Sequence, residues 1–188
     1  MVRELPSTLA EVLTTSAAQE ASLNFHLEEG LVSMSGCELV ERALAGARVL
    51  AAQGIGPGDA VGVLGPNRPE WVVWAWATWA AGATFVPLQI PLRVHSPDAF
   101  AEQVRSLVHT ADCRLVLADP RLVSIVGDDV CVPWDMPASP PGADPVPGGP
   151  DDPAVLQFTS GSTSAPKGAL LTHRAVMAQM KVLVAGTP

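Results

Sequence analysis

The sequence predicts an α/β fold: a largely parallel sheet flanked by helices. Segments with helical periodicity alternate with short apolar runs along most of the 188 residues. Glycine or proline stands at most of the junctions, where it ends one element and turns the chain into the next. Elements that alternate in this way build βαβ units, whose strands run parallel with helices packed on the sheet. The length is sufficient for one domain with a hydrophobic core.

Bulk composition excludes several classes of function. The net charge is −8 and the chain holds 11 Lys and Arg residues, whereas binding to a nucleic-acid backbone needs a basic face. Cys37, Cys113 and Cys131 are widely spaced and form no CxxC pair, which favours reduced structural thiols. Residues 1–6 lack the apolar core of a signal peptide. We therefore expect a cytoplasmic protein that does not bind nucleic acid.

The N-terminal part predicts a short helix, a hairpin and a longer helix. A capping box that begins at Thr8 opens the short helix. Apolar and polar residues alternate over residues 23–27, and a turn at Gly30 leads into a second short run, which predicts a β-hairpin. A second capping box, beginning at Ser35, opens an amphipathic helix that Gly54 ends.

The middle of the chain alternates strands with helices. Pro69 suits the first position of a helix that Gly82 ends, and a further helix begins near Ser96. Strands are expected at residues 60–64, 83–87, 114–118 and 129–132, with a short element near Leu122.

Residues 71–92 carry no charge and are long enough to span a bilayer. Gly82, Pro87 and Pro91 interrupt this stretch, so a buried helix followed by a buried strand is favoured and no membrane span is expected. The helix contains four tryptophans: Trp71, Trp74, Trp76 and Trp79. A tryptophan stripe could bind a flat ligand, but helical spacing favours packing in the core.

We divide the chain into an α/β subdomain over residues 1–132, a Pro/Gly-rich loop over 133–153, and a final part over 154–188. The loop is rich in Pro, Gly, Ala and Asp and shows no amphipathic period, so we expect an exposed, stiff connection; a domain boundary is the alternative. The final part predicts a strand at 154–158, a hydroxyl-rich loop, a strand at 168–171 and a helix capped by Thr172.

The loop has the composition of a phosphate-binding segment. It reads Thr159-Ser-Gly-Ser-Thr163-Ser-Ala-Pro-Lys167-Gly. Hydroxyls and backbone N–H groups on both sides of Gly161 could form an anion-binding nest, because glycine lets the backbone approach a ligand closely. Lys167 supplies a mobile positive charge for phosphate oxygens. The alternative is a solvated connector between two strands.

A Walker loop, G-x-x-x-x-G-K-[ST], is disfavoured on two grounds. Gly161 and Lys167 have its separation, but Pro166 replaces its second glycine and Gly168 replaces the hydroxyl that would bind magnesium. Gly168 also enters an apolar strand, whereas a Walker loop leads into a helix. A P-loop ATPase or kinase is therefore not expected.

Residues 152–168, followed by Thr172-His173, resemble the phosphate-loop signature of adenylate-forming (AMP-binding) enzymes. That superfamily includes acyl-CoA synthetases, fatty-acyl-AMP ligases and nonribosomal-peptide adenylation domains. Further segments with the family's order and spacing lie upstream: residues 35–39, 54–59, 64–70, 81–83 and 86–88. Gln157 and the Thr-Ser-Gly-Ser-Thr run favour the fatty-acyl-AMP ligase branch.

The resemblance implies that a carboxylic acid, with a fatty acid favoured, attacks ATP to give an acyl-adenylate and pyrophosphate. ATP and Mg²⁺ are the implied cofactors, and a thiol of CoA or of an acyl carrier protein is the implied acceptor. The implied contacts to the β- and γ-phosphates are Thr159, Ser160, Gly161, Ser162, Thr163 and Lys167. Ser164 stands where many members have glycine, which puts the detail of the ATP contact in question.

The resemblance also implies that the chain is the N-terminal subdomain of the adenylate-forming fold. The family's catalytic residues and its magnesium-binding acid would lie downstream, so we expect no catalytic residue and no metal ligand here and an inactive isolated chain. A noncatalytic scaffold that keeps the fold is the alternative. His173, beside a helix cap, favours a bracing role over that of a general base, and Asp119, before Pro120, favours a turn.

Overall fold

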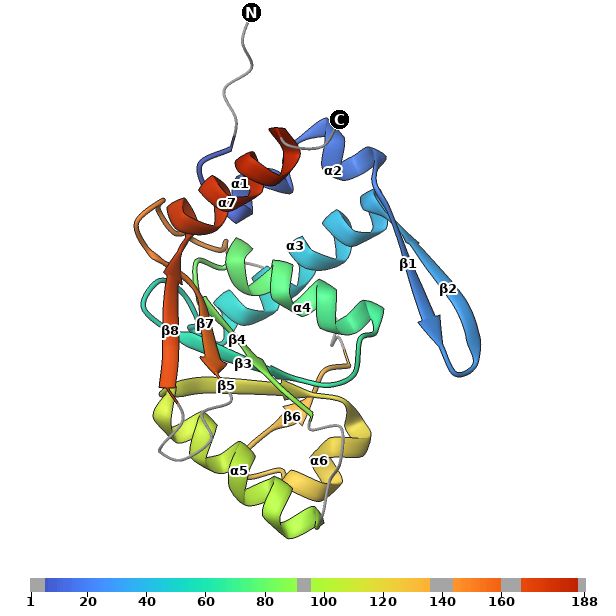
Figure 1. The fold of residues 1–188 in the computed structure, drawn as a ribbon, viewed down its shortest axis with the longest axis vertical. Helices are drawn as coiled ribbons and strands as arrows, with labels where there is room; N and C mark the ends of the chain where they lie inside the picture. The colour runs from blue at the N-terminus through green and yellow to red at the C-terminus, as the bar shows by residue number, and fades with distance from the viewer. Residues whose placement is uncertain (1–5, 91–95, 136–143, 160–166, 186–188) are drawn as a thin grey trace, which may run out of the picture.

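The computed structural model describes residues 6–90, 96–135, 144–159 and 167–185. Among these residues a six-stranded sheet lies between helical layers, and a two-stranded hairpin projects from one side (Figure 1). The sheet strands are β3 (Ala60–Leu64), β4 (Thr84–Leu88), β5 (Cys113–Ala118), β6 (Val132–Pro133), β7 (Pro153–Thr159) and β8 (Lys167–Thr172). The hairpin consists of β1 (Ser22–Leu27) and β2 (Gly30–Ser35).

Strand order in the sheet is β6-β5-β3-β4-β7-β8. All neighbours are parallel except β7 and β8, which form an antiparallel pair at one edge. The predicted α/β fold with a largely parallel sheet flanked by helices is therefore confirmed.

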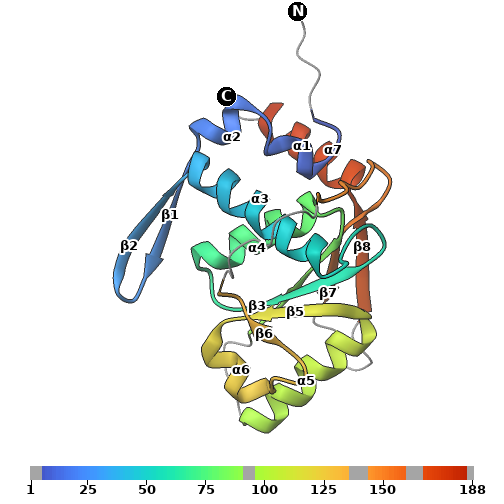
Figure 2. The ribbon, with the colours of Figure 1, turned by 180° about the vertical axis from the view of Figure 1, so that it is seen from behind.

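The two faces of the sheet carry different helices (Figures 1 and 2). On one face α3 (Gly36–Ala52) and α4 (Pro69–Ala80) pack over β3 and β4, and on the other α5 (Pro97–Thr110) and α6 (Pro120–Val126) pack over β3, β4 and β5. The remaining helices are α1 (Leu9–Val12), α2 (Ser16–Glu20) and α7 (His173–Ala185). Residues of α1 and α7 share an apolar cluster with Trp76 and Trp79 of α4.

Local sequence signals explain where the helices begin. The Thr8 capping box at α1 is complete, since Thr8 accepts from the Glu11 N–H and the Glu11 carboxylate accepts from the Thr8 N–H. Ser35 caps α3 by accepting from the Glu38 N–H at 3.1 Å. Pro69 occupies the first turn of α4, where its missing N–H costs no hydrogen bond.

The tryptophans of α4 form part of the core, as helical spacing predicts. Trp74 is 1% exposed, and its indole N–H donates to the Trp134 carbonyl at 2.7 Å. Trp71 and Trp79 contact Phe85 of β4 edge to face, with ring centroids 5.2 and 5.5 Å apart. The uncharged stretch thus forms a buried helix and then a buried strand. None of the helices within the described ranges meets the length and hydropathy needed for a membrane span.

Two predictions need correction. A strand over residues 129–132 is wrong, because residues 128–130 form a turn in which the Val130 N–H donates to the Gly127 carbonyl, and β6 begins only at Val132. The segment 133–153 is not exposed throughout. Trp134 is 3% exposed because its indole lies against Gly65, where an added Cβ would come within 2.1 Å of the ring.

The three cysteines are free, consistent with the predicted unpaired thiols. Cys37 is exposed and Cys131 is buried. Burial, assisted by the nearby Asp112 charge, raises the pKa of the Cys113 thiol to about 12, so this side chain stays a neutral thiol near pH 7.

Candidate phosphate-binding site

The predicted phosphate loop connects the two antiparallel strands β7 and β8. Thr159, the last residue of β7, pairs in register with Lys167, the first residue of β8. The Thr159 hydroxyl also donates to the Lys167 carbonyl at 3.3 Å. Paired Cα atoms of antiparallel strands lie about 4.5–5.5 Å apart, so the chain leaves the sheet and returns to it over a short distance.

Of the six predicted phosphate contacts, the structure brings Thr159 and Lys167 together. Directly opposed residues of an antiparallel pair point to the same face, so a hydroxyl and an ammonium group stand side by side where the loop begins and ends. Both residues are exposed. Ser160, Gly161, Ser162 and Thr163 lie outside the described residues.

Gly168 fixes the approach of the two strands below the loop. It pairs with Phe158, and a Cβ added at Gly168 would lie 2.8 Å from the Leu156 Cδ1 atom. A larger residue at Gly168 would require the Leu156 side chain to move. Because Lys167-Gly168 opens a strand and not a helix, the structure agrees with the rejection of a Walker loop.

The position of the loop in the sheet also suits ligand binding. β7 runs parallel to β4, so Thr159 lies at the carboxyl edge of the parallel strands. The chain leaves β3 for α4 on one face, and it leaves β4 for α5 on the opposite face. In open α/β sheets, ligands bind outside the carboxyl ends of strands where the connections diverge in this way.

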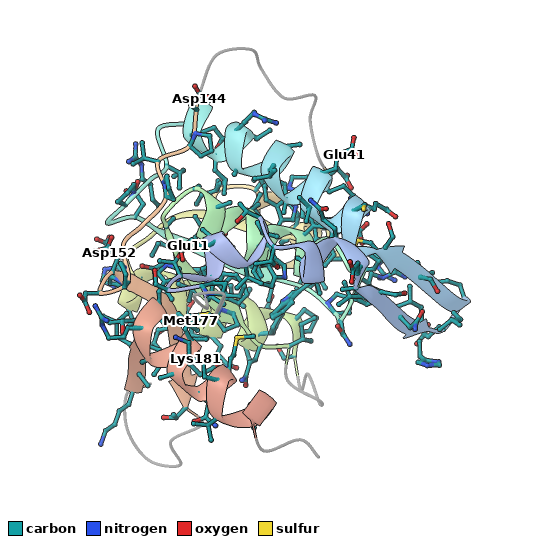
Figure 3. All side chains as sticks on the ribbon, turned by 90° about the horizontal axis from the view of Figure 1, so that it is seen from above. Glu11, Glu41, Asp144, Asp152, Met177 and Lys181 are labelled. Carbon is teal, nitrogen blue, oxygen red and sulfur yellow. The ribbon has the colours of Figure 1, made fainter. Side chains whose placement is uncertain are left out.

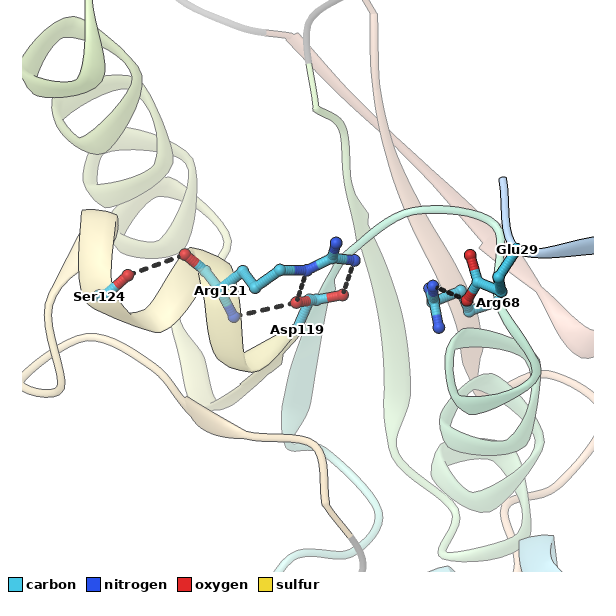
Figure 4. A network of polar contacts seen from close by, with 5 residues as sticks. All are labelled: Glu29, Arg68, Asp119, Arg121 and Ser124. Carbon is cyan, nitrogen blue, oxygen red and sulfur yellow. Dashed lines mark hydrogen bonds and ion pairs between the residues drawn. The ribbon is translucent and has the colours of Figure 1, made fainter. Parts of the chain in front are cut away.

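A polar network occupies the same edge (Figure 4). Asp119 follows β5, is 4% exposed, and caps α6 by accepting from the Arg121 N–H at 2.9 Å. The Arg121 guanidinium binds both Asp119 carboxylate oxygens at 3.1 Å. Arg68, before α4, pairs with Glu29 at the turn of the β1–β2 hairpin. The expectation of a turn residue at Asp119 is confirmed in the form of a helix cap.

Electrostatics keep Asp119 ionised. Burial alone would raise the pKa of its carboxyl, but the side-chain and backbone hydrogen bonds from Arg121 outweigh burial and hold that pKa below its ordinary value. A carboxylate in this state is unsuited to donate a proton near pH 7. The pair of Arg68 with Glu29 was missed at the sequence level, because it joins residues on separate elements.

The described residues include no clustered set of metal ligands. Within the described ranges, no three His, Cys, Asp or Glu side chains form a group that could hold a metal ion. Mg²⁺ in nucleotide sites is commonly held by one or two carboxylates together with phosphate oxygens and waters.

The similarity of this chain to known proteins extends over the β7–β8 hairpin. Residues 14–187 match the model of the family described as "AMP-binding enzyme". This chain belongs to the AMP-binding enzyme family. The match includes the β7–β8 hairpin and the helices on both faces of the sheet.

Individual relatives of this AMP-binding chain are much longer. Feruloyl-CoA synthase of Amycolatopsis sp is 38% identical over 152 residues, which cover 78% of this chain and 30% of that protein. One solved structure from the fatty acyl-adenylate ligases of E. coli and L. pneumophila is 27% identical, with a TM-score of 0.82 over 97% of this chain and 35% of its own. The chain thus spans about a third of the length of each of these two relatives.

A second solved structure supports the fold alone. The fatty acyl-adenylate ligase of L. pneumophila, in complex with acyl adenylate and pyrophosphate, is 22% identical with a TM-score of 0.82. It covers 96% of this chain and 33% of its own chain. These matches agree with the prediction of the N-terminal subdomain of the adenylate-forming fold.

Proposed function

We propose that this AMP-binding chain forms part of an ATP-dependent ligase that activates a carboxylic acid as an acyl-adenylate. The observation that carries the proposal is the pairing of Thr159 with Lys167 at the carboxyl edge of the parallel sheet. This pairing anchors both ends of a hydroxyl- and glycine-rich loop beside a positive charge. Such a loop suits the oxygens of a polyphosphate.

In this proposal the loop binds the β- and γ-phosphates, which leave as pyrophosphate. Thr159, Ser160, Ser162 and Thr163 offer hydroxyl or backbone donors, and Lys167 neutralises charge that develops on the leaving group. Gly161 allows close approach of the backbone. Donors held in place before the reaction stabilise the transition state without reorganisation, which is why the pairing of β7 with β8 at the ends of the loop matters.

The proposed acid is a fatty acid, and the proposed acceptor is a thiol of CoA or of a carrier protein. Similarity to fatty acyl-adenylate ligases supports the first, and similarity to a feruloyl-CoA synthase supports CoA as an acceptor. ATP is the proposed nucleotide. Mg²⁺, when bound with ATP, would neutralise phosphate charge, and its protein ligand belongs to the part of the ligase outside these residues.

We propose the same division of the chain as the sequence indicates. Residues 1–132 form the α/β subdomain, 133–153 connect it, and 154–188 carry the phosphate hairpin and the following helix. The relatives' greater length supports a further proposal: these 188 residues do not form acyl-adenylate alone.

Carboxylate-dependent exchange of pyrophosphate into ATP, measured in the full-length parent protein, tests the proposed function. The double variant Lys167→Ala with Thr163→Ala should lose this exchange by a factor of at least about 100, since the loss of a single donor to developing charge already costs about 3 kcal/mol. Lys181→Ala is the matched control, because Lys181 is an exposed lysine on α7.

Two results would reject the proposal. Unchanged exchange in the double variant would remove the phosphate role of the loop. A parent protein that binds ATP but shows no exchange with a range of carboxylic acids would favour the alternative, a noncatalytic scaffold that retains the fold.

A further inference from the structure

His173 joins two parts of the chain that lie far apart in sequence. It is the first residue of α7 and is 0% exposed. Its Nδ1 atom accepts a hydrogen bond from the backbone N–H of Leu9 at 3.2 Å, across 164 positions of sequence. Leu9 is the first residue of α1, and N–H groups in the first turn of a helix have no partner within the helix. His173 therefore satisfies one N–H group at the start of α1, next to the Thr8 cap.

The hydrogen bond fixes the protonation state of the imidazole. A ring nitrogen that accepts must be unprotonated, so the neutral ring carries its proton on Nε2. Within the described parts of the chain, Nε2 of His173 is the one buried side-chain N or O atom without a hydrogen-bond partner. A second proton on Nδ1 would face the Leu9 N–H donor directly. The contact thus exists in the neutral form alone.

The surroundings of the ring favour the neutral form. Burial lowers the pKa of His173, and the charges of Asp152 and Glu11 oppose this effect without reversing it. Glu11 lies on α1 and Asp152 precedes β7; both are labelled in Figure 3. The neighbouring charge on α7, Arg174, is paired with Asp151 at 2.7 Å. The positive end of the α7 dipole also disfavours an imidazolium at its first residue.

Contacts around His173 reach the hairpin that carries the proposed phosphate site. The His173 N–H donates to the Asp152 carbonyl at 3.2 Å, directly before β7, and Thr172 pairs with Pro153 across the two strands. Met177 of α7 packs with Leu9 and Ala154 in one buried cluster. The end of the β7–β8 hairpin opposite the Thr159–Lys167 pair therefore lies beside the contact that holds α1.

We propose that His173 is a positioning residue: its neutral imidazole fastens α1 to the start of α7, and its protonation releases α1 and loosens the β7–β8 hairpin. The coupling to phosphate binding rests on the proposed function of that hairpin, whereas the contact between α1 and α7 does not.

The direction of the pH effect follows from the lowered pKa. In the folded state the His173 imidazole binds a proton less readily than in the unfolded state. Neutral His173 therefore makes its full contribution to the stability of the folded state above the ordinary histidine pKa of about 6.5. It is lost as pH falls from there through the folded pKa. The change therefore begins as pH falls below about 6.5 and is complete only once pH lies below the folded pKa.

Nuclear magnetic resonance on the ¹⁵N-labelled 188-residue chain tests the contact directly. We expect an unprotonated Nδ1 on His173 near pH 8, and a shift of the Leu9 amide signal that follows the titration of the His173 ring. Protection of the Leu9 amide from exchange, corrected for the intrinsic pH effect, should fall about five- to tenfold on acidification. A Leu9 amide that does not change when the ring titrates would overturn the proposal.

Two substitutions separate the acceptor from the titration. His173→Asn places an amide oxygen where Nδ1 stands and removes the titrating group, so Leu9 should stay protected at both ends of the pH range. His173→Gln carries its amide one bond further out and should leave Leu9 unprotected at both. A wild-type pH response that persists in His173→Asn contradicts the assignment. The titration of the wild-type chain decides the question if either variant fails to fold.

Inorganic pyrophosphate is the probe for the second part of the proposal, the coupling between His173 protonation and phosphate binding. Its affinity, followed through the Thr159 and Lys167 amide signals, should fall on acidification in the wild type more than in His173→Asn. Equal pH dependence in both proteins would reject the coupling. Failure of pyrophosphate to bind either protein even near pH 8 would instead reject the proposed function, and the Leu9 result would still decide the contact between α1 and α7.

Discussion

The centre of the sheet and its β8 edge have similar sequences but different environments. β3 reads Ala-Val-Gly-Val-Leu, and Val61, Val63 and Leu64 are each 0% exposed. β8 includes Gly-Ala-Leu-Leu, yet Leu170 is 58% and Leu171 is 41% exposed. Helices cover both faces of β3, whereas β8 lies at the edge of the sheet. An apolar run thus predicts a strand, but it does not predict what covers that strand.

The exposure of the β8 edge is consistent with the greater length of the relatives. The described residues complete the packing around β3 and β4, and the AMP-binding relatives continue well beyond the matched region. We expect mutations in the centre to cost stability in this chain, and mutations at the β8 edge to have little effect on it.

Trp74→Ala should give the largest effect. It removes a fully buried indole and leaves the Trp134 carbonyl without its partner at 2.7 Å. Large-to-small changes of this kind cost about 3–5 kcal/mol. Urea denaturation followed by circular dichroism measures the loss. A loss below about 1 kcal/mol would contradict the packing described for α4.

Gly82→Ala should cost about 1–3 kcal/mol. Gly82 has a φ of +78°, and an added Cβ would lie 2.3 Å from the Val146 carbonyl oxygen. Gly30→Ala is the matched control, because Gly30 also has a positive φ, +125°, but no atom within 4 Å of the added carbon. Equal losses in the two variants would show that backbone conformation alone, and not the contact with Val146, limits Gly82.

The sequence predicts the central elements well because their signals are local. Pro69 and Gly82 bound α4 at its two ends, and the strand at residues 60–64 matches β3. The predicted strand at 129–132 was wrong because Val130 lies within a turn whose hydrogen bonds converge on the Gly127 carbonyl, and only Val132 belongs to a strand. A short apolar run does not distinguish a turn over a buried cysteine from a strand.

The candidate site likewise has features that were predictable from the sequence and features that were not. Its loop composition and the two strands around it were predictable from sequence, and Thr159 and Lys167 now lie opposite each other. Contacts that join distant segments were not predictable. The bond from Leu9 to His173 and the pair of Arg68 with Glu29 depend on how separate elements pack.

Asp119→Asn should cost about 0.5–1 kcal/mol at neutral pH, a modest value because Arg121 is largely exposed. Asparagine caps helices nearly as well as aspartate, so this change isolates the charge. Because the pKa of Asp119 is lowered in the folded state, its charge contributes fully to stability above the ordinary aspartate pKa of about 3.9. This contribution is lost as pH falls through the pKa that Asp119 has in the folded state. Denaturation midpoints across acid pH should therefore converge for variant and wild type.

Leu170→Ser should change the stability of this chain by less than about 0.5 kcal/mol, because Leu170 is already mostly exposed on the edge strand. The same urea titration used for Trp74→Ala measures it. A loss comparable with that of Trp74→Ala would show that β8 is covered and would remove the contrast between centre and edge.

Binding of inorganic pyrophosphate to the chain, compared between Lys167→Ala and Lys181→Ala, tests the central claim most directly. The two variants remove the same charge, one beside the proposed phosphate loop and one on α7. We expect Lys167→Ala to weaken binding about tenfold, as the loss of one charged hydrogen bond implies, and Lys181→Ala to leave it unchanged. Equal binding by the two variants would contradict the assignment of the β7–β8 loop as a phosphate site.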